Sequence, residues 1–220
     1  MHLVQRFLKN QRGYTLTELS IALTISAFLF VALIALFTAN LKHHEITINT
    51  NRLNEQLEAS IEIMTNEIRR AGYWLNASND LGSSQNNNPF MAAGTDITIN
   101  GSCILFTYDR NQSGALVPIS ASSNDDRVGF RLSSEAIQSR PYGAPFDCNT
   151  ANSNWENITD PSIVKVTQLS FTFTTQNITT GSRSLAIRGV NISLTGQLVN
   201  DTSITRTITQ YVRIRNDKFS

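Results

Sequence analysis

The most constraining feature of this sequence is a predominantly apolar segment, Leu19 to Leu41, that contains no charged residue. An α-helix rises about 1.5 Å per residue, so this segment would form a helix about 35 Å long. The hydrocarbon core of a bilayer is about 30 Å thick. The segment is therefore long enough to cross a membrane, which predicts one spanning helix near the N-terminus.

The charges around the apolar segment predict its orientation. Residues 1–13 contain Arg6, Lys9 and Arg12 and no acidic residue. Basic residues stay on the cytoplasmic side of a spanning helix, so the C-terminal part is expected outside the cytoplasm. The formal net charge of the chain is +1, and without these three basic residues it is −2. Such a charge does not favour nucleic-acid binding, and no nucleic-acid partner is expected.

Three explanations account for an apolar segment in this position. A secretory signal peptide needs a cleavage site of small residues after the apolar segment, and Lys42-His43-His44-Glu45 does not provide one. A plain membrane anchor does not explain Glu18, because an unpaired acid at mid-membrane depth costs about 2.5–3.5 kcal/mol. The third explanation is a cut before the apolar segment, after Gly13.

The residues around Gly13 resemble a known signal. Arg12-Gly13-Tyr14-Thr15-Leu16-Thr17-Glu18-Leu19 looks like the class III signal of type IV prepilins, with a basic leader, a glycine, an apolar residue and a glutamate four residues further on. The resemblance implies that the prepilin peptidase, a membrane-embedded aspartyl peptidase, cuts between Gly13 and Tyr14 and methylates the new amine of Tyr14. The family more often has phenylalanine at this position, and tyrosine keeps the ring.

Cleavage would leave a cationic amine on Tyr14, one helical turn before the Glu18 carboxylate. In an apolar interior each charge needs a partner. The resemblance implies that the amine of one subunit meets the Glu18 carboxylate of its neighbour in the filament, so that a subunit in the wrong register leaves both charges unpaired. The alternative is that Glu18 is an acid at the membrane interface without a role in assembly.

One long helix is expected to continue beyond the apolar segment. No glycine or proline lies between Tyr14 and Ala71, and apolar residues recur at three- and four-residue steps at Leu53, Leu57, Ile61, Met64 and Ile68. The expected divisions are a leader peptide at 1–13, a transmembrane and assembly helix at 14–41, an amphipathic half at 42–72 and a β-rich periplasmic head at 73–220.

From Tyr73 onward, short apolar runs alternate with polar turns, which predicts strands and loops. The expected strands are 97–99, 103–108, 116–119, 128–132, 163–174, 185–199 and 204–214, with a hairpin turn at Asn200-Asp201. The predicted fold class is therefore α+β. Its long N-terminal helix, apolar in the first half and amphipathic in the second, packs on an antiparallel β-sheet head.

Four later segments extend the resemblance: Arg69–Trp74, Cys103–Asp109, Val128–Leu132 and Val212–Asp217. They look like those of PilW-type minor pilins, and the J-type pseudopilins of type II secretion are the related alternative. The resemblance implies a minor subunit that primes type IV pilus assembly near the filament tip. It also implies location in the inner membrane, with a periplasmic head, and then in the filament. The implied partners are prepilin peptidase, other minor pilins, the major pilin, the inner-membrane assembly platform and, as a further candidate, a tip adhesin.

Cys103 and Cys148 are the only cysteines. A disulfide between them is expected because both lie in the exported part, where disulfides persist. Two buried free thiols are the alternative. Residues 109–114 match the first half of a calcium loop, but the twelfth position is Ser120 instead of glutamate, which favours an ordinary turn.

No catalytic constellation stands out in the sequence. No histidine lies beyond His44, so the head lacks the commonest general base and metal ligand. No nucleophile–base pair, paired-carboxylate pattern or glycine-rich phosphate loop is evident. The sequence therefore predicts a structural subunit that is not an enzyme and needs no cofactor or metal. The alternative is a membrane-anchored periplasmic enzyme or binding domain.

Overall fold

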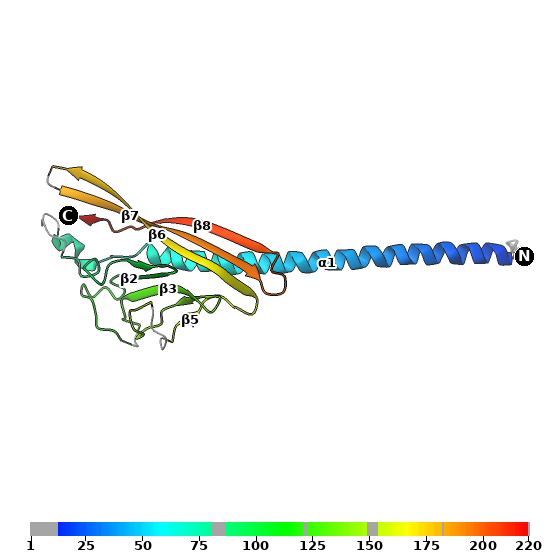
Figure 1. Ribbon diagram of the computed structural model, residues 1–220, viewed down its shortest axis with the longest axis horizontal. Helices are drawn as coiled ribbons and strands as arrows, with labels where there is room; N and C mark the ends of the chain where they lie inside the picture. Colours follow the sequence, from blue (N-terminus) through cyan, green and yellow to red (C-terminus); the bar gives the residue numbers. More distant parts are fainter. Residues whose placement is uncertain (1–12, 81–86, 121–122, 149–153, 182, 220) are drawn as a thin grey trace, which may run out of the picture. The chain divides into compact units, whose positions relative to one another are not determined.

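The computed structural model describes residues 13–80, 87–120, 123–148, 154–181 and 183–219 (Figure 1). The chain divides into two compact units, Met1–Ile48 and Asn49–Ser220. Of the leader predicted at 1–13, only Gly13 lies within the described residues.

Helix α1 comprises Leu16–Ile68 and is continuous, in line with the absence of glycine and proline. It is shorter at both ends than the helix predicted over 14–72. At its C-terminal end the chain turns, and the Gly72 N–H donates to the Thr107 carbonyl at 2.8 Å. Gly72 has a φ of 72°, and a Cβ there would lie 2.5 Å from Met91 Cε. Glycine is therefore required at this turn.

In the first unit, the apolar side chains of α1 are exposed on all sides, and none of the spanning window is buried. Phe28, for example, is 84% exposed. A helix that is apolar all round needs an apolar environment, either lipid or other helices. By length and composition α1 can cross a membrane, which fits membrane anchoring of this chain.

In the second unit, the predicted amphipathic pattern of α1 is confirmed. The face at three- and four-residue steps is 7% exposed or less, and it consists of Leu53, Leu57, Ile61, Met64 and Ile68. The acidic residues Glu55, Glu58 and Glu62 are exposed. Full burial of one such apolar side chain contributes about 1.5–3 kcal/mol, so this face fastens the helix to the head.

The described residues of the head form two antiparallel sheets. The first has the order β1-β2-β3-β4-β5. Its strands are β1 (Thr98–Asn100), β2 (Cys103–Thr107), β3 (Arg127–Ser133), β4 (Ala136–Ser139) and β5 (Glu156–Asn157). Every residue of β2 is buried, and this strand contributes Ile104 and Phe106 to the core shared with α1.

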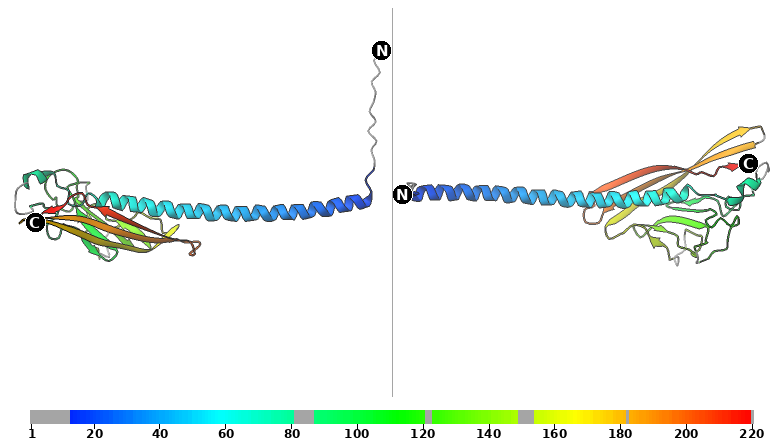
Figure 2. Two further views of the ribbon diagram at one scale, coloured as in Figure 1. Left: turned by 90° about the horizontal axis from the view of Figure 1, so that it is seen from above. Right: turned by 180° about the vertical axis from the view of Figure 1, so that it is seen from behind.

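The second sheet has the order β6-β7-β8, with β9 also paired to β7. Its strands are β6 (Val164–Thr180), β7 (Arg183–Leu198), β8 (Thr205–Arg213) and β9 (Lys218–Phe219). β6 and β7 form a long hairpin whose closed end extends past β8, as the view from behind shows (Figure 2). The inner face of this sheet completes the core through residues such as Phe171, Ile192 and Leu194.

The α+β class and the antiparallel sheets are confirmed, and one strand prediction is wrong. Residues 116–119 form no strand, because side chains satisfy their backbone instead of a neighbouring strand. The Val117 N–H donates to Asp126 Oδ2 at 3.0 Å, and the Val117 carbonyl accepts from Arg127 Nη1 at 2.8 Å. The sequence also fails to predict the short strands β4, β5 and β9, which have four, two and two residues. A short helix not predicted from the sequence, η1 (Leu75–Asp80), follows the turn at Gly72.

Candidate processing and assembly site

The bond expected to be cut lies just before α1. Gly13 and Tyr14 are outside the helix and exposed, with Tyr14 at 89%. A Cβ built on Gly13 would meet no described atom within 4 Å. In the described part of the chain, the backbone between these two residues is therefore accessible, as a peptidase requires.

The first turn of α1 is held by reciprocal hydrogen bonds between Thr15 and Glu18. The Thr15 N–H donates to Glu18 Oε2 at 2.9 Å, and the Thr15 hydroxyl donates to the same oxygen at 3.0 Å. In return, the Glu18 N–H donates to Thr15 Oγ1 at 3.3 Å. This is a capping box, which satisfies two backbone N–H groups that a helix start otherwise leaves unpaired.

The capping box gives Glu18 a role within its own subunit that the sequence reasoning missed. The signal was present, because threonine followed three residues later by glutamate is the sequence pattern of a capping box. Both hydrogen bonds that the Glu18 carboxylate accepts from Thr15 end on Oε2. Within the described residues, Oε1 accepts no hydrogen bond, and the carboxylate can still receive a donor from outside the subunit.

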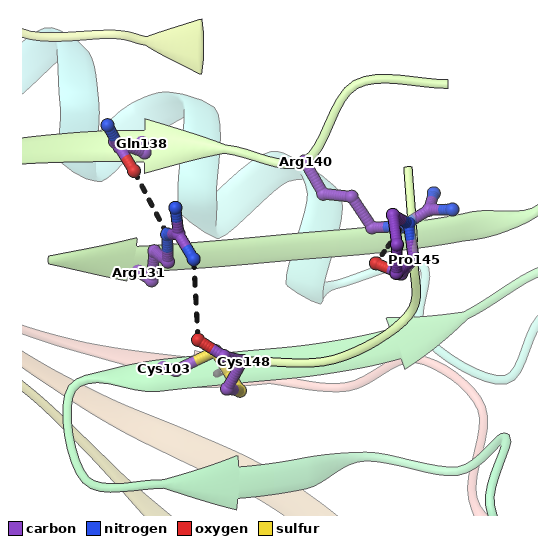
Figure 3. Close-up of a disulfide and its surroundings, with 6 residues drawn as sticks. All are labelled: Cys103, Arg131, Gln138, Arg140, Pro145 and Cys148. Atoms are coloured by element: carbon purple, nitrogen blue, oxygen red, sulfur yellow. Dashed lines mark hydrogen bonds between the residues drawn. A yellow bond between two sulfur atoms is a disulfide. The ribbon is translucent and has the colours of Figure 1, made fainter. Parts of the chain in front are cut away.

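In the head, the predicted disulfide is confirmed. The Sγ atoms of Cys103 and Cys148 are 2.08 Å apart, and the Cα atoms are separated by 6.0 Å. Cys103 lies on β2, while Cys148 ends the segment that follows β4 (Figure 3). Arg131 supports the link, because its Nη1 donates to the Cys148 carbonyl and its Nε donates to Gln138 Oε1. The disulfide thus fastens this segment to the beginning of β2 in the first sheet.

A buried ion pair holds the other end of the same segment. Arg140 Nη2 lies 2.9 Å from Asp125 Oδ2, and both side chains are fully buried. Arg140 also donates to the carbonyls of Arg127, Ala144 and Pro145. Burial lowers the pKa of Arg140, and the hydrogen bond and charge of Asp125 act in the opposite direction.

Residues 109–114, which resemble half of a calcium loop, form an irregular loop around the Asp109 carboxylate. Asp109 is 1% exposed and accepts three backbone N–H bonds, from Leu75, Ser113 and Gly114, at 2.9–3.0 Å. Its carboxylate oxygens are therefore occupied by the backbone. Among the described residues, no group of three histidine, cysteine or acidic side chains is placed to hold a metal ion.

Asp126 engages the backbone in the same way. It is fully buried, and it accepts the N–H groups of Arg110 and Val117 at 3.0 Å each. Burial raises the pKa of Asp126, and these two hydrogen bonds act to lower it. The buried acids of the head thus hold the loops beside the first sheet by accepting their backbone N–H groups, which is a structural role.

Two known families each match a part of the chain. Residues 46–214 match the family described as prepilin peptidase-dependent protein B, and residues 8–34 match the prokaryotic N-terminal methylation motif. The second match includes Gly13, Tyr14 and Glu18. No curated protein and no solved structure matches the chain significantly. The resemblance to type IV pilin-like minor pilins is thus confirmed, while the PilW type within that group stays a prediction. The chain belongs to the prepilin peptidase-dependent protein B family of type IV pilin-like proteins.

Proposed function

We propose that this chain is a minor pilin that primes or supports type IV pilus assembly near the filament tip, after the prepilin peptidase has cut between Gly13 and Tyr14. The observation that carries the proposal is the combination of two matches in one chain. The methylation motif at 8–34 includes the start of an apolar helix that can cross a membrane, and the prepilin peptidase-dependent family covers 46–214. A filament subunit needs both an N-terminal segment that is processed and anchors it, and a head domain.

In this proposal, cleavage converts Tyr14 into a methylated N-terminal residue with a cationic amine. Glu18 of a neighbouring subunit is its counter-charge. The capping box supports this role, because Oε2 is fixed by Thr15 while Oε1 remains open to a donor. The carboxylate is therefore held at the first turn of α1 before a neighbour arrives, which reduces the entropy lost on docking.

The proposed passage of the subunit from the inner membrane into the filament follows from the four expected divisions of the chain. The leader, 1–13, remains cytoplasmic and is removed. The apolar helix, 14–41, holds the subunit in the inner membrane while the amphipathic half, 42–72, and the head, 73–220, occupy the periplasm. The subunit then passes into the filament together with other minor pilins and the major pilin. The assembly platform moves it, and an adhesin is a candidate partner at the tip.

The head fits a structural role better than catalysis. Its buried carboxylates at Asp109, Asp125 and Asp126 are all engaged by backbone N–H groups or by an arginine. A catalytic acid or base needs a carboxylate that can reach a substrate. We therefore propose that the chain is not an enzyme and that it works without a cofactor.

Deletion of the gene is the test of the priming role. Because a priming subunit acts in few copies at the start of assembly, the major pilin should still be made and cleaved, while filament number falls sharply. Electron microscopy of filaments and immunoblots of the major pilin measure the two effects. Normal filaments, twitching and secretion in the deletion strain would contradict the proposal. If secretion alone fails, the J-type pseudopilin of a type II secretion system is the correct assignment.

A further inference from the structure

The free edges of the two sheets differ in how they are protected. An unpaired strand edge offers a row of N–H and C=O groups to any other strand, and natural proteins shield such edges by short length or by charge. In the described head, β1 and β5 have three and two residues. β8 is longer, but it carries the exposed residues Arg206 and Arg213. These three edges are therefore protected.

The outer edge of β6 is protected only at its beginning. A bulge lies between Val166 and Gln168, and the Val166 N–H donates to the Glu135 carbonyl at 2.8 Å. Lys165 there forms an ion pair with Glu135 at 2.9 Å. From Leu169 to Thr180 the strand contains no charged residue, proline or glycine. We call this stretch the open edge, because β7 is the strand paired with it and no described strand pairs on its other side.

Two large apolar side chains are exposed on the open edge. Phe173 is 42% exposed and Ile178 is 47% exposed. They are five residues apart without an intervening bulge, so they lie on opposite faces of the sheet. Phe173 is opposite the buried Val190 on the inner face, and Ile178 is opposite Leu185. A strand added at this edge would cover both side chains as well as the backbone groups.

From these features we propose that the open edge is a strand-addition site, and that its occupant is an extended strand from the head of a neighbouring pilin-type subunit. This inference rests on the proposed function. A row of backbone donors and acceptors is matched by another extended backbone, which defines the chemistry of the partner. The absence of charge over twelve consecutive positions, Leu169–Thr180, leaves no ion-pair partner for a charged strand, which favours a partner strand that is itself uncharged.

A pilin-type neighbour also explains how the open edge avoids uncontrolled pairing. An uncharged open edge is an aggregation hazard for a freely diffusing protein. Subunits that α1 anchors in a membrane meet chiefly when assembly brings them together, so the edge can be retained without uncontrolled pairing. Strand addition would then join the heads of adjacent subunits, while α1 joins them in the apolar layer.

The first test is site-specific photo-crosslinking of the full chain in its native host. Ile178 is replaced by p-benzoylphenylalanine, and Thr209 on the arginine-bearing strand β8 is the matched control. The expected result is an adduct from position 178, but not from 209, with a strand in the head of another chain that carries a prepilin signal. An adduct with a second copy of this chain, an adduct with a chain lacking such a signal, or no adduct would overturn the proposal.

The second test places lysines on the edge. The double variant Phe173→Lys/Ile178→Lys is compared with Thr205→Lys/Thr209→Lys, which adds the same charge to exposed positions of β8. Loss of about 1.4 kcal/mol of association is a tenfold effect, and filament number should fall by about tenfold or more in the first variant only. Resistance of the head to protease shows whether each variant is folded.

The outcomes separate this inference from the proposed function. If gene deletion abolishes filaments but the folded Phe173→Lys/Ile178→Lys variant assembles normally, strand addition is wrong and the priming role stands. If gene deletion has no effect on filaments, the proposed function fails first. Equal losses in both double variants would mean that added charge is harmful anywhere on this sheet, which would also overturn the inference.

Discussion

Glu18→Ala protein should be inserted and cleaved but absent from sheared filaments. Removing a carboxylate from an apolar helix makes membrane insertion no harder, and the peptidase is expected to depend on Gly13. Docking should fail, because the Tyr14 amine loses its counter-charge in an apolar environment. Leaving one member of a buried pair unpaired costs about 3–5 kcal/mol, more than a hundredfold in an association constant. Immunoblots of sheared filaments and membranes measure the distribution.

The matched control is Glu18→Gln, because glutamine can also close a capping box with Thr15. This variant keeps the first turn of α1 and removes only the charge. If the charge pair drives docking, Glu18→Gln should be missing from filaments as Glu18→Ala is. If Glu18→Gln enters filaments at the wild-type level, the carboxylate serves only to cap its own helix. Gly13→Ser, which should block the cut itself, marks the uncleaved protein on the same blots.

Asp125→Ala should destabilise the head by about 3–5 kcal/mol. The substitution leaves the fully buried guanidinium of Arg140 without its carboxylate. It also removes the acceptor for the N–H groups of Gly143 and Arg127. Denaturant unfolding of the purified full chain, with the Cys103–Cys148 disulfide intact, measures the free energy of unfolding.

Asp201→Ala is the control for that measurement. Asp201 also accepts a backbone N–H, from Ser203 at 3.1 Å, but it is exposed. An exposed substitution away from a buried network usually changes stability by about 0.5 kcal/mol or less, and loss of a local turn bond adds to this only modestly. Equal effects of Asp125→Ala and Asp201→Ala would show that the buried ion pair does not stabilise the head.

Local patterns account for the parts of the fold that the sequence predicts well. The buried face of α1 follows from the spacing of Leu53, Leu57 and Ile61, because helical periodicity alone sets which side chains share a face. The disulfide follows from the cellular compartment and from the presence of only two cysteines. Both inferences need no knowledge of distant contacts.

Other features depend on contacts that the sequence does not reveal. The pair of Asp125 and Arg140 joins residues fifteen positions apart through an irregular segment, without a local signal. β6 continues to Thr180, beyond the predicted end at 174, because its ladder with β7 overrides the poor strand propensity of Asn177. The capping box, by contrast, has a local signal, because a threonine at position 15 is followed three residues later by Glu18.

The most direct test of the central claim is mass spectrometry of the N-terminal peptide of this chain, purified from sheared filaments of its native host. The expected result is a peptide that begins at Tyr14 and carries a methyl group on its amine. A chain that retains Met1–Gly13 in cells with active prepilin peptidase, or that begins at any other residue, would contradict it.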